Sequence, residues 1–267
     1  MNVWELFKLN GKVAFVTGGA RNLGYDMALA LAEAGADVAV TSRKLDSARA
    51  TAEKIAKATG RKAIGYALDV ASEADVEKTI AALLADFGRL DILVNNAGNV
   101  TSTPETAPFE KRSLKLWQET LDVNLTGVFL CSKHVVAKCM KPSKSGVIVN
   151  IGSTAGLIGK DRRMYRGTPM GGATLDYHAA KGGVINMTRD MAVYLAPDNI
   201  RVNCISPGGF WRGHSETFTR QYSETVPMAR MGQDGKELKG AVLFLASEAS
   251  SYVTGHNLVV DGGVTAW

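Results

Sequence analysis

Short apolar runs rich in β-branched residues alternate along the chain with longer segments whose apolar residues recur at helical spacing. The runs cover residues 13–17, 37–42, 62–70, 91–98, 146–153, 200–208 and 257–263. Between them, segments such as the one that carries Val76, Ile80 and Leu83 show the spacing of a helix. Strands that are apolar throughout and separated by helices are typical of a parallel sheet that helices cover on both faces. The pattern therefore predicts an α/β protein with a doubly wound fold.

The length and composition predict a single domain over residues 1–267. The chain has 267 residues, of which 46% are apolar, and this is enough for one large core. Residues 99–115 and 154–176 fit neither the strand nor the helix pattern, so we expect loops there. Ligands of open α/β sheets bind beyond the carboxyl ends of the strands, and the loops that follow the strands are therefore the place to look for chemistry.

Charge, cysteines and missing motifs argue against several classes of function. The formal charge of +5 and the pI of 9.0 favour anionic ligands, but no run of five or six basic residues points to a nucleic-acid partner. Cys131, Cys139 and Cys204 form no CxxC pair, which predicts buried thiols rather than a disulfide framework or a zinc site. No HExxH or GxSxG motif occurs, so we expect neither a metal site nor a serine esterase. The sequence has no signal-like N-terminus and no apolar stretch of roughly 18 residues, and we expect a cytoplasmic protein outside the membrane.

The stretch TGGARNLG at residues 17–24 predicts a phosphate-binding turn. It lies between the first strand and a helix that we expect to begin near Gly24, where backbone N–H groups and the helix dipole favour an anion. Asn22 stands where such a turn most often carries a glycine, but asparagine tolerates a left-handed backbone. A tight turn without a ligand is the alternative. The predicted cofactor contacts in this stretch are Gly18, Arg21, Asn22, Leu23 and Gly24.

Ser42 and Arg43 end the second strand, where a protein that prefers NAD usually carries an acidic residue. Together with Arg21 they favour NADP, because two guanidinium groups suit a 2′-phosphate. NAD remains possible, and two solvated surface arginines are the alternative interpretation.

Polar residues also end the next two strands. ALDV ends in Asp69 and Val70, and NNAG contains Asn96, Ala97 and Gly98. Each could be an ordinary turn. Because they follow successive strands beside the glycine turn, we expect them to form walls of one cofactor cleft.

YHAAK places Tyr177 and Lys181 four residues apart, so that both side chains share one face of a helix. A nearby ammonium favours the phenolate and brings the pKa of a tyrosine toward the working range. Ser153 ends the fifth strand and can hydrogen-bond a substrate oxygen. Asn124 lies within a predicted helix, where asparagine is a mediocre helix former.

In this order, TGGARNLG, NNAG, Asn124, Ser153, YHAAK and SPGG resemble the small, single-domain short-chain dehydrogenase/reductases over nearly the whole chain. The resemblance implies a Rossmann-like sheet of seven parallel strands and a nicotinamide cofactor. It also implies a catalytic tetrad of Asn124, Ser153, Tyr177 and Lys181. In it the tyrosine transfers the proton, the lysine holds the nicotinamide ribose, the serine orients the substrate and the asparagine maintains a water relay. Tyr177 and Lys181 therefore also count as cofactor contacts.

The sequence departs from the family pattern in two places. The family's usual spacing from its serine lands beside Tyr165, but Pro169 follows four residues later and supplies no ammonium, so Tyr177 is the predicted catalyst. The roughly ten extra residues imply a loop beside the substrate. After SPGG the family's usual threonine is missing, although Pro207 and Gly208 of the nicotinamide-side turn are present.

We expect substrate loops at about residues 154–176 and 209–230. They carry the candidate substrate residues Arg163, Arg166 and Arg212, which with Ser153 would favour an anionic substrate. A solvated basic loop is the alternative.

Together these features predict an NADP(H)-preferring oxidoreductase that interconverts a secondary alcohol and a ketone on a small polar substrate. The chain most resembles gluconate 5-dehydrogenase-like and other sugar or polyol dehydrogenases. The alternatives are an enzyme like the 3-oxoacyl-carrier-protein reductases and a catalytically silent dinucleotide-binding protein. The apolar C-terminal segment resembles the part that family members bury between subunits, which implies a homotetramer.

Overall fold

The computed structural model describes residues 2–100, 103 and 108–267 of the chain. Within them one sheet has the order β3-β2-β1-β4-β5-β6-β7, and each pair of neighbouring strands is parallel. This confirms the predicted doubly wound α/β fold with seven parallel strands. The strands are β1 (Val13–Val16), β2 (Asp37–Ser42), β3 (Ala63–Ala67), β4 (Ile92–Asn95), β5 (Gly146–Ile151), β6 (Ile200–Pro207) and β7 (Asn257–Val260).

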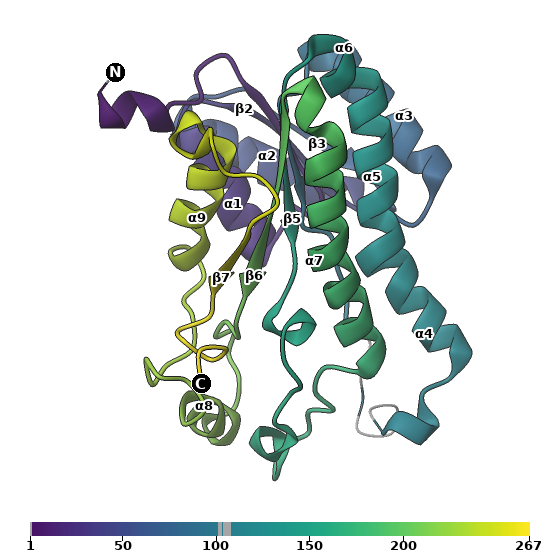
Figure 1. Ribbon diagram of the computed structural model, residues 1–267, viewed down its shortest axis with the longest axis vertical. Coiled ribbons are helices and arrows are strands. Elements are labelled where there is room, and N and C mark those ends of the chain that lie inside the picture. The colour runs from purple at the N-terminus through teal and green to yellow at the C-terminus, as the bar shows by residue number, and fades with distance from the viewer. Residues whose placement is uncertain (1, 101–102, 104–107) are drawn as a thin grey trace.

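Helices cover both faces of the sheet (Figure 1). One core cluster packs α1, α2 and α9 against the sheet, and a second cluster packs α3, α5 and α7 against the opposite face. The helices are α1 (Asn22–Glu33), α2 (Leu45–Thr59), α3 (Glu73–Phe87), α4 (Leu114–Leu121), α5 (Gly127–Val135), α6 (Lys141–Ser143), α7 (Leu175–Leu195), α8 (Glu216–Ser223) and α9 (Glu237–Ala246).

Short helical segments join these elements. They are the 3₁₀ segments η1 (Val3–Phe7), η2 (Phe109–Lys111), η5 (Thr154–Gly156), η6 (Arg162–Tyr165), η7 (Ala196–Asp198) and η8 (Glu248–Ser250), and the π-helical segments η3 (Asp122–Thr126) and η4 (Val136–Met140). The predicted loop over 154–176 therefore contains η5 and η6, and the loop over 209–230 contains α8. The predicted loop over 99–115 lies partly outside the described residues, and α4 begins within its end.

Six of the seven predicted strands run past the observed carboxyl ends, by three residues at β3, β4 and β7, and only residues 37–42 match β2. Residues 68–70 and 96–98 lie beyond β3 and β4 and are irregular. Leu68 and Val70 are nevertheless buried, with 4% and 6% of their surface exposed. The apolar pattern therefore continues after the chain has left the sheet, which explains the overestimate.

The strand order places the site. The chain winds outward in one direction from β1 through β2 to β3 and in the other direction from β4 onward, so a crevice is expected between β1 and β4 at their carboxyl ends. The segments after β5 and β6 gather at that edge, at the lower end of Figure 1.

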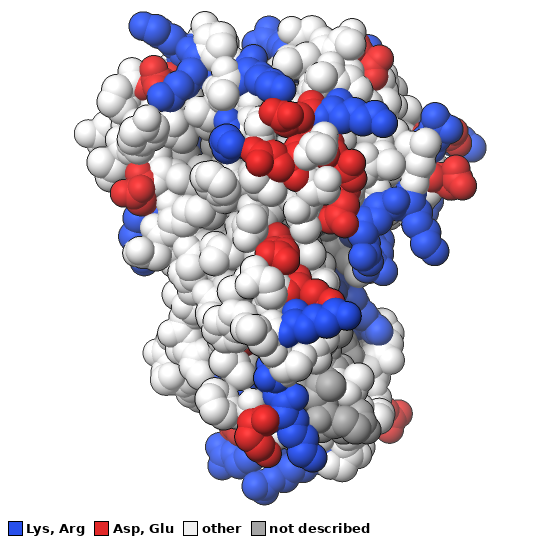
Figure 2. All heavy atoms as spheres, turned by 90° about the vertical axis from the view of Figure 1, so that its right-hand side faces the viewer, with Lys and Arg blue, Asp and Glu red and all other residues white. Residues whose placement is uncertain are grey.

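The three cysteines lie in the core, and charged side chains lie on the surface. Cys131, Cys139 and Cys204 are buried and free, as predicted, and burial raises the pKa of Cys131 to about 12. Basic and acidic side chains are interspersed on the face that Figure 2 shows. One ion pair links α5 to α3, where Lys133 Nζ lies 2.6 Å from Glu73 Oε1. Among the described residues, no helix has the length and apolarity that a membrane span requires.

Candidate active site

The glycine turn is held by side chains on both sides of it. Gly18 donates its N–H to Thr41 Oγ1 at 3.1 Å, and Asn96 Nδ2 donates to the carbonyl oxygens of Thr17 at 2.9 Å and Gly18 at 3.1 Å. Gly18 has a φ of 61°, and a Cβ there would lie 2.9 Å from Ala97 Cα. The turn is therefore packed directly against the NNAG segment that follows β4.

Asn22 adopts the left-handed backbone expected of it, with a φ of 50°. Helix α1 begins at this residue, slightly before the predicted start near Gly24, and no side chain caps it. The first N–H groups of the twelve-residue helix are therefore available to an anion at the carboxyl edge of β1. This uncapped end fits the pyrophosphate of a dinucleotide, with Asn22, Leu23 and Gly24 as the residues that would hold it.

The two arginines predicted to recognise a 2′-phosphate are exposed. In the part of the chain that the structure describes, neither the Arg21 nor the Arg43 side chain makes a hydrogen bond or an ion pair. Ser42, at the end of β2, accepts a hydrogen bond from the N–H of Lys44 at 3.2 Å. Both guanidinium groups are thus free to bind a phosphate, and their role stays a prediction.

The other predicted cofactor residues lie on the same edge of the sheet. Asp69 Oδ1 accepts the N–H of Ala71 at 3.0 Å, so this side chain stabilises its own turn, which was the alternative interpretation. Gly208 donates its N–H to Val260 at 3.0 Å, and this bond fixes the Pro207–Gly208 turn on the end of β7. Their contacts with a cofactor stay predictions.

Asn124 lies in η3, a π-helical segment between α4 and α5, and it is fully buried. Its Nδ2 donates to Thr120 O at 2.9 Å and to Asn99 O at 2.9 Å, and its Oδ1 accepts the N–H of Asn99 at 3.3 Å. π-Helical segments are frequent at functional sites because they turn one residue out of helical register. Here the segment aims an asparagine at the loop after β4.

Lys181 and Tyr177 both come from the first turns of α7. Lys181 is 4% exposed, and its Nζ donates to Ile151 O, the last residue of β5, at 2.7 Å. Burial lowers the pKa of Lys181 to about 8. Its Nζ lies 5.6 Å from the centre of the Tyr177 ring.

Ser153 follows β5 after Gly152, and its side chain lies close enough to Tyr177 to lower the pKa of the phenol. Its Oγ also accepts the N–H of Ala155 at 3.1 Å, which fixes the start of η5. A Cβ on Gly156 would lie 2.6 Å from the backbone carbon of Lys181, so η5 packs directly on α7. The predicted tyrosine, serine and lysine are therefore brought together.

The pKa of Tyr177 is set by opposing effects. Burial has the largest effect and leaves the pKa above its ordinary value, although the side chain of Ser153 and the positive charge of Arg212 each lower it. This net rise is opposite to the lowering expected from a nearby ammonium, and Arg212, not Lys181, is the cation that acts on the phenol.

Tyr165 is placed in a different cluster. Its ring stacks on Phe218 of α8 with the centroids 5.5 Å apart, and a Cβ on Gly172 would lie 2.6 Å from the same ring. Phe218 in turn contacts Tyr222, 5.9 Å away between centroids. Tyr165 thus joins the two substrate loops, and Tyr177 is the tyrosine beside Ser153 and Lys181.

Two of the three arginines predicted to bind substrate already have acidic partners. Arg163 Nη2 lies 2.8 Å from Asp161 Oδ2, and the Arg163 side chain is 77% exposed. Arg212 Nε lies 3.0 Å from Asp234 Oδ2. Arg166 is exposed at the end of η6. Arg212 is the one whose charge reaches Tyr177, and it is the strongest of the three candidates.

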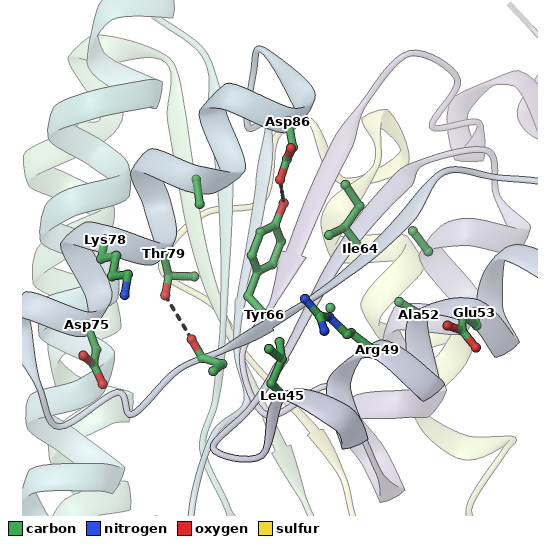
Figure 3. A pocket seen from close by; sticks show the side chains of 14 residues that line it. Leu45, Arg49, Ala52, Glu53, Ile64, Tyr66, Asp75, Lys78, Thr79 and Asp86 are labelled. Atoms are coloured by element: carbon green, nitrogen blue, oxygen red, sulfur yellow. Dashed lines mark hydrogen bonds between the residues drawn. The ribbon is translucent and has the colours of Figure 1, made fainter.

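A cavity of about 630 Å³ lies between the glycine turn and the second substrate loop, with Asn22, Trp211, Arg212 and Asp234 in its wall. A second cavity, of about 640 Å³, lies along β3 between α2 and α3 (Figure 3). Tyr66 at its centre donates its hydroxyl to Asp86 Oδ2 at 2.7 Å. No residue of the tetrad lines either cavity, but the first contacts the glycine turn through Asn22 and contains Arg212, whose charge lowers the pKa of Tyr177, so we place the site beside the first.

The residues that fix the glycine turn and Asn124 by hydrogen bonds were not identified from the sequence. Thr17 and Thr41 are each 1% exposed and fix the glycine turn, and Asn99 fixes Asn124. Threonines in apolar strands were the available signal for the first two. Nothing in the spacing identified Asn99.

Comparisons with known proteins agree with this geometry. The family profile described as enoyl-(acyl carrier protein) reductase matches residues 18–265. The chain is 38% identical to 2-dehydro-3-deoxy-D-gluconate 5-dehydrogenase of Formosa agariphila, over 98% of this chain and 96% of that protein. It is 37% identical to a 3-oxoacyl-[acyl-carrier-protein] reductase of Aquifex aeolicus, over 96% of this chain and 98% of that protein.

A solved structure shows the same likeness. A gluconate 5-dehydrogenase from Burkholderia cenocepacia, in complex with NADP and tartrate, is 32% identical and has a TM-score of 0.89. The match covers 100% of both chains.

Proposed function

The chain belongs to the short-chain dehydrogenase/reductase family of NAD(P)-dependent alcohol and ketone oxidoreductases, and we propose that it prefers NADP(H) and acts on a small polar substrate of the sugar-acid or polyol type. The observation that carries this proposal is the grouping of Tyr177, Ser153 and Lys181 near Gly98, in the NNAG segment that packs against the glycine turn. A nicotinamide cofactor, when bound, supplies or accepts the hydride.

Tyr177 moves the proton at the substrate oxygen. In alcohol oxidation its phenolate accepts the hydroxyl proton, and in ketone reduction its hydroxyl donates it. The side chain of Ser153 lies close enough to Tyr177 to influence its pKa, so a substrate oxygen that contacts both groups is held next to the proton donor.

The side chains of Lys181 and Asn124 both approach Gly98. A Cβ on Gly98 would lie 2.9 Å from Asn124 Oδ1 and 3.8 Å from Lys181 Nζ. One hydrogen of Lys181 Nζ goes to Ile151 O, and the others can point to a cofactor ribose. We propose that the proton leaves Tyr177 by way of Lys181 and Asn124.

The NADP preference rests on Arg21 and Arg43. Both are exposed, and in the described part of the chain neither has an acidic partner that would compete with a 2′-phosphate. The Burkholderia cenocepacia relative was solved with NADP, which supports the same choice.

The substrate class rests on the relatives and on the second substrate loop. The charge of Arg212 reaches Tyr177, so an anionic group near the reacting carbon would meet a cation. That arginine is also paired with Asp234, which moderates its attraction for a carboxylate. A 3-oxoacyl-carrier-protein reductase is the second candidate, favoured by the identity with the Aquifex aeolicus protein.

A substrate panel tests the proposal. Sugar acids, neutral polyols and acyl thioesters are each assayed with NADPH or NADP⁺ and with NADH or NAD⁺. We expect the highest kcat/KM for a sugar acid or polyol with the phosphorylated cofactor, and a preference for the anionic members. Turnover confined to thioesters favours the second candidate, and NADPH binding without any turnover favours a silent dinucleotide-binding protein.

We also propose that the protein forms a homotetramer. All four residues of β7, an edge strand, are only partly buried, and Tyr252 just before it is fully exposed. Phe129 and Val193 expose 49% and 78% of their surface on α5 and α7. Light scattering on the purified protein measures the mass, and a monomeric mass contradicts this proposal.

A further inference from the structure

A buried ion pair lies next to the proposed catalytic residues, between the start of α4 and the start of α7. Arg112, which precedes α4, and Asp176, in the first turn of α7, have side chains that are 2% and 0% exposed. Arg112 Nε donates to Asp176 Oδ2 at 3.0 Å, and Nη2 donates to the same oxygen. Burial alone would raise the pKa of Asp176, but the hydrogen bond and charge of Arg112 contribute to a net lowering.

The same arginine reaches the segment that holds Asn124. Arg112 Nη2 donates to Thr120 Oγ1 at 3.1 Å, and the backbone oxygen of Thr120 accepts a hydrogen bond from Asn124 Nδ2 at 2.9 Å. On the other side, Asp176 directly precedes Tyr177 in the chain. One guanidinium group therefore bridges the two elements that carry the asparagine and the tyrosine of the site.

We propose that Arg112 and Asp176 are positioning residues that fix Tyr177 relative to Asn124. This inference rests on the proposed oxidoreductase function. The stability of the fold does not require this ion pair, because a buried ion pair contributes little net stability compared with apolar residues of similar volume. The planar fork of arginine can hold a carboxylate and a hydroxyl at once, which a lysine ammonium on a flexible stem does less rigidly. A misplacement of about 1 Å in such a site can lower the rate about 100-fold.

Removing one partner leaves a buried charge unpaired and destabilises the protein. A single neutral variant would therefore not show whether lost activity comes from a misplaced Tyr177 or from a less stable fold. The neutral pair Arg112→Met with Asp176→Leu leaves no charge behind, and Arg112→Lys keeps the charge of the pair. Leu83→Ala on α3, a fully buried core position, is the matched control that destabilises without touching the site.

Three measurements are made on each variant: the melting temperature, kcat and KM on the best substrate of the parent, and the NMR signal of the Tyr177 phenol carbon in protein without cofactor. The last uses ring-labelled tyrosine, and the signal is assigned by its absence from Tyr177→Phe. We expect Arg112→Lys and the neutral pair to unfold near the parental temperature. Their kcat should fall at least tenfold with a smaller change in KM, and the Tyr177 signal should shift or broaden. Leu83→Ala should melt earlier and keep the parental signal and kcat.

Parental kcat and an unchanged Tyr177 signal in Arg112→Lys overturn the proposal, as does a kcat that simply follows the melting temperature across all variants. If the neutral pair does not fold, Arg112→Lys decides alone. A parent without turnover on any substrate counts against the proposed function instead, and the Tyr177 signal then still tests the positioning.

Discussion

Replacement of Arg43 by alanine tests the cofactor assignment. Arg43 is exposed at the end of β2, with no ion pair among the described residues, so its removal disturbs no internal contact. A charge-assisted hydrogen bond contributes about 1.5–3 kcal/mol, and solvent at an exposed site places this one in the lower half of that range. About 1.5–2 kcal/mol corresponds to a roughly 10- to 30-fold loss of kcat/KM for the phosphorylated cofactor. NAD(H) has a hydroxyl group in place of the 2′-phosphate, so its kcat/KM should change little.

The assay measures kcat/KM with both cofactors at low ionic strength, together with the Kd of NADPH from its fluorescence. Arg49→Ala, an exposed arginine on α2, is the matched control and should leave the ratio between the cofactors unchanged. Combining Arg43→Ala with Arg21→Ala should reduce the ratio further. The NADP assignment is refuted if the parent uses NADH as well as NADPH. It is also refuted if the ratio of kcat/KM for the two cofactors in Arg43→Ala stays within twofold of the parental ratio.

Three further predictions follow from the geometry of the site. Arg212→Gln removes a positive charge that lowers the pKa of Tyr177, so the acid limb of the pH profile for alcohol oxidation should move to higher pH; a limb that stays in place contradicts the role of Arg212. Lys181→Met removes a buried ammonium group whose pKa burial lowers to about 8, whereas a lysine in the unfolded chain has a pKa of about 10.4. Between these two pH values the unfolded chain binds more protons than the folded protein, so the stability of the parent rises with pH across that range. The methionine variant should therefore lose activity and melt a few degrees higher than the parent at pH 7, and a lower melting temperature contradicts the cost assigned to that burial. Gly98→Ala places a methyl group 2.9 Å from Asn124 Oδ1 and should lower kcat about tenfold with a smaller effect on NADPH binding, whereas unchanged kcat argues against a role for Asn124.

The fold could be predicted from the sequence because each strand of a covered parallel sheet is apolar throughout. The strand ends could not be placed as well, since Leu68 and Val70 stay buried after the chain has left the sheet. The left-handed backbone at Asn22 followed from the residue type and is confirmed, because few other side chains tolerate that conformation.

The candidate tetrad could be chosen from spacing and resemblance, but its surroundings depend on contacts that are distant in the sequence. Nothing near Tyr165 shows that Phe218 stacks on its ring. Likewise, the partner of Arg212 is Asp234, from a segment 22 residues away, and this pairing changes how that arginine meets a substrate. Such pairings follow from the way the substrate loops fold together, and a linear pattern contains no signal for them.

The most direct test of the account is Tyr177→Phe, compared with Tyr165→Phe, on the best substrate of the panel. The phenylalanine keeps the ring and its packing but removes the proton-transfer group, so turnover at position 177 should fall at least about 1,000-fold while NADPH binds with the parental Kd. Tyr165→Phe should keep turnover within a few-fold of the parent. Retained turnover in Tyr177→Phe, or its loss only in Tyr165→Phe, contradicts the proposed mechanism.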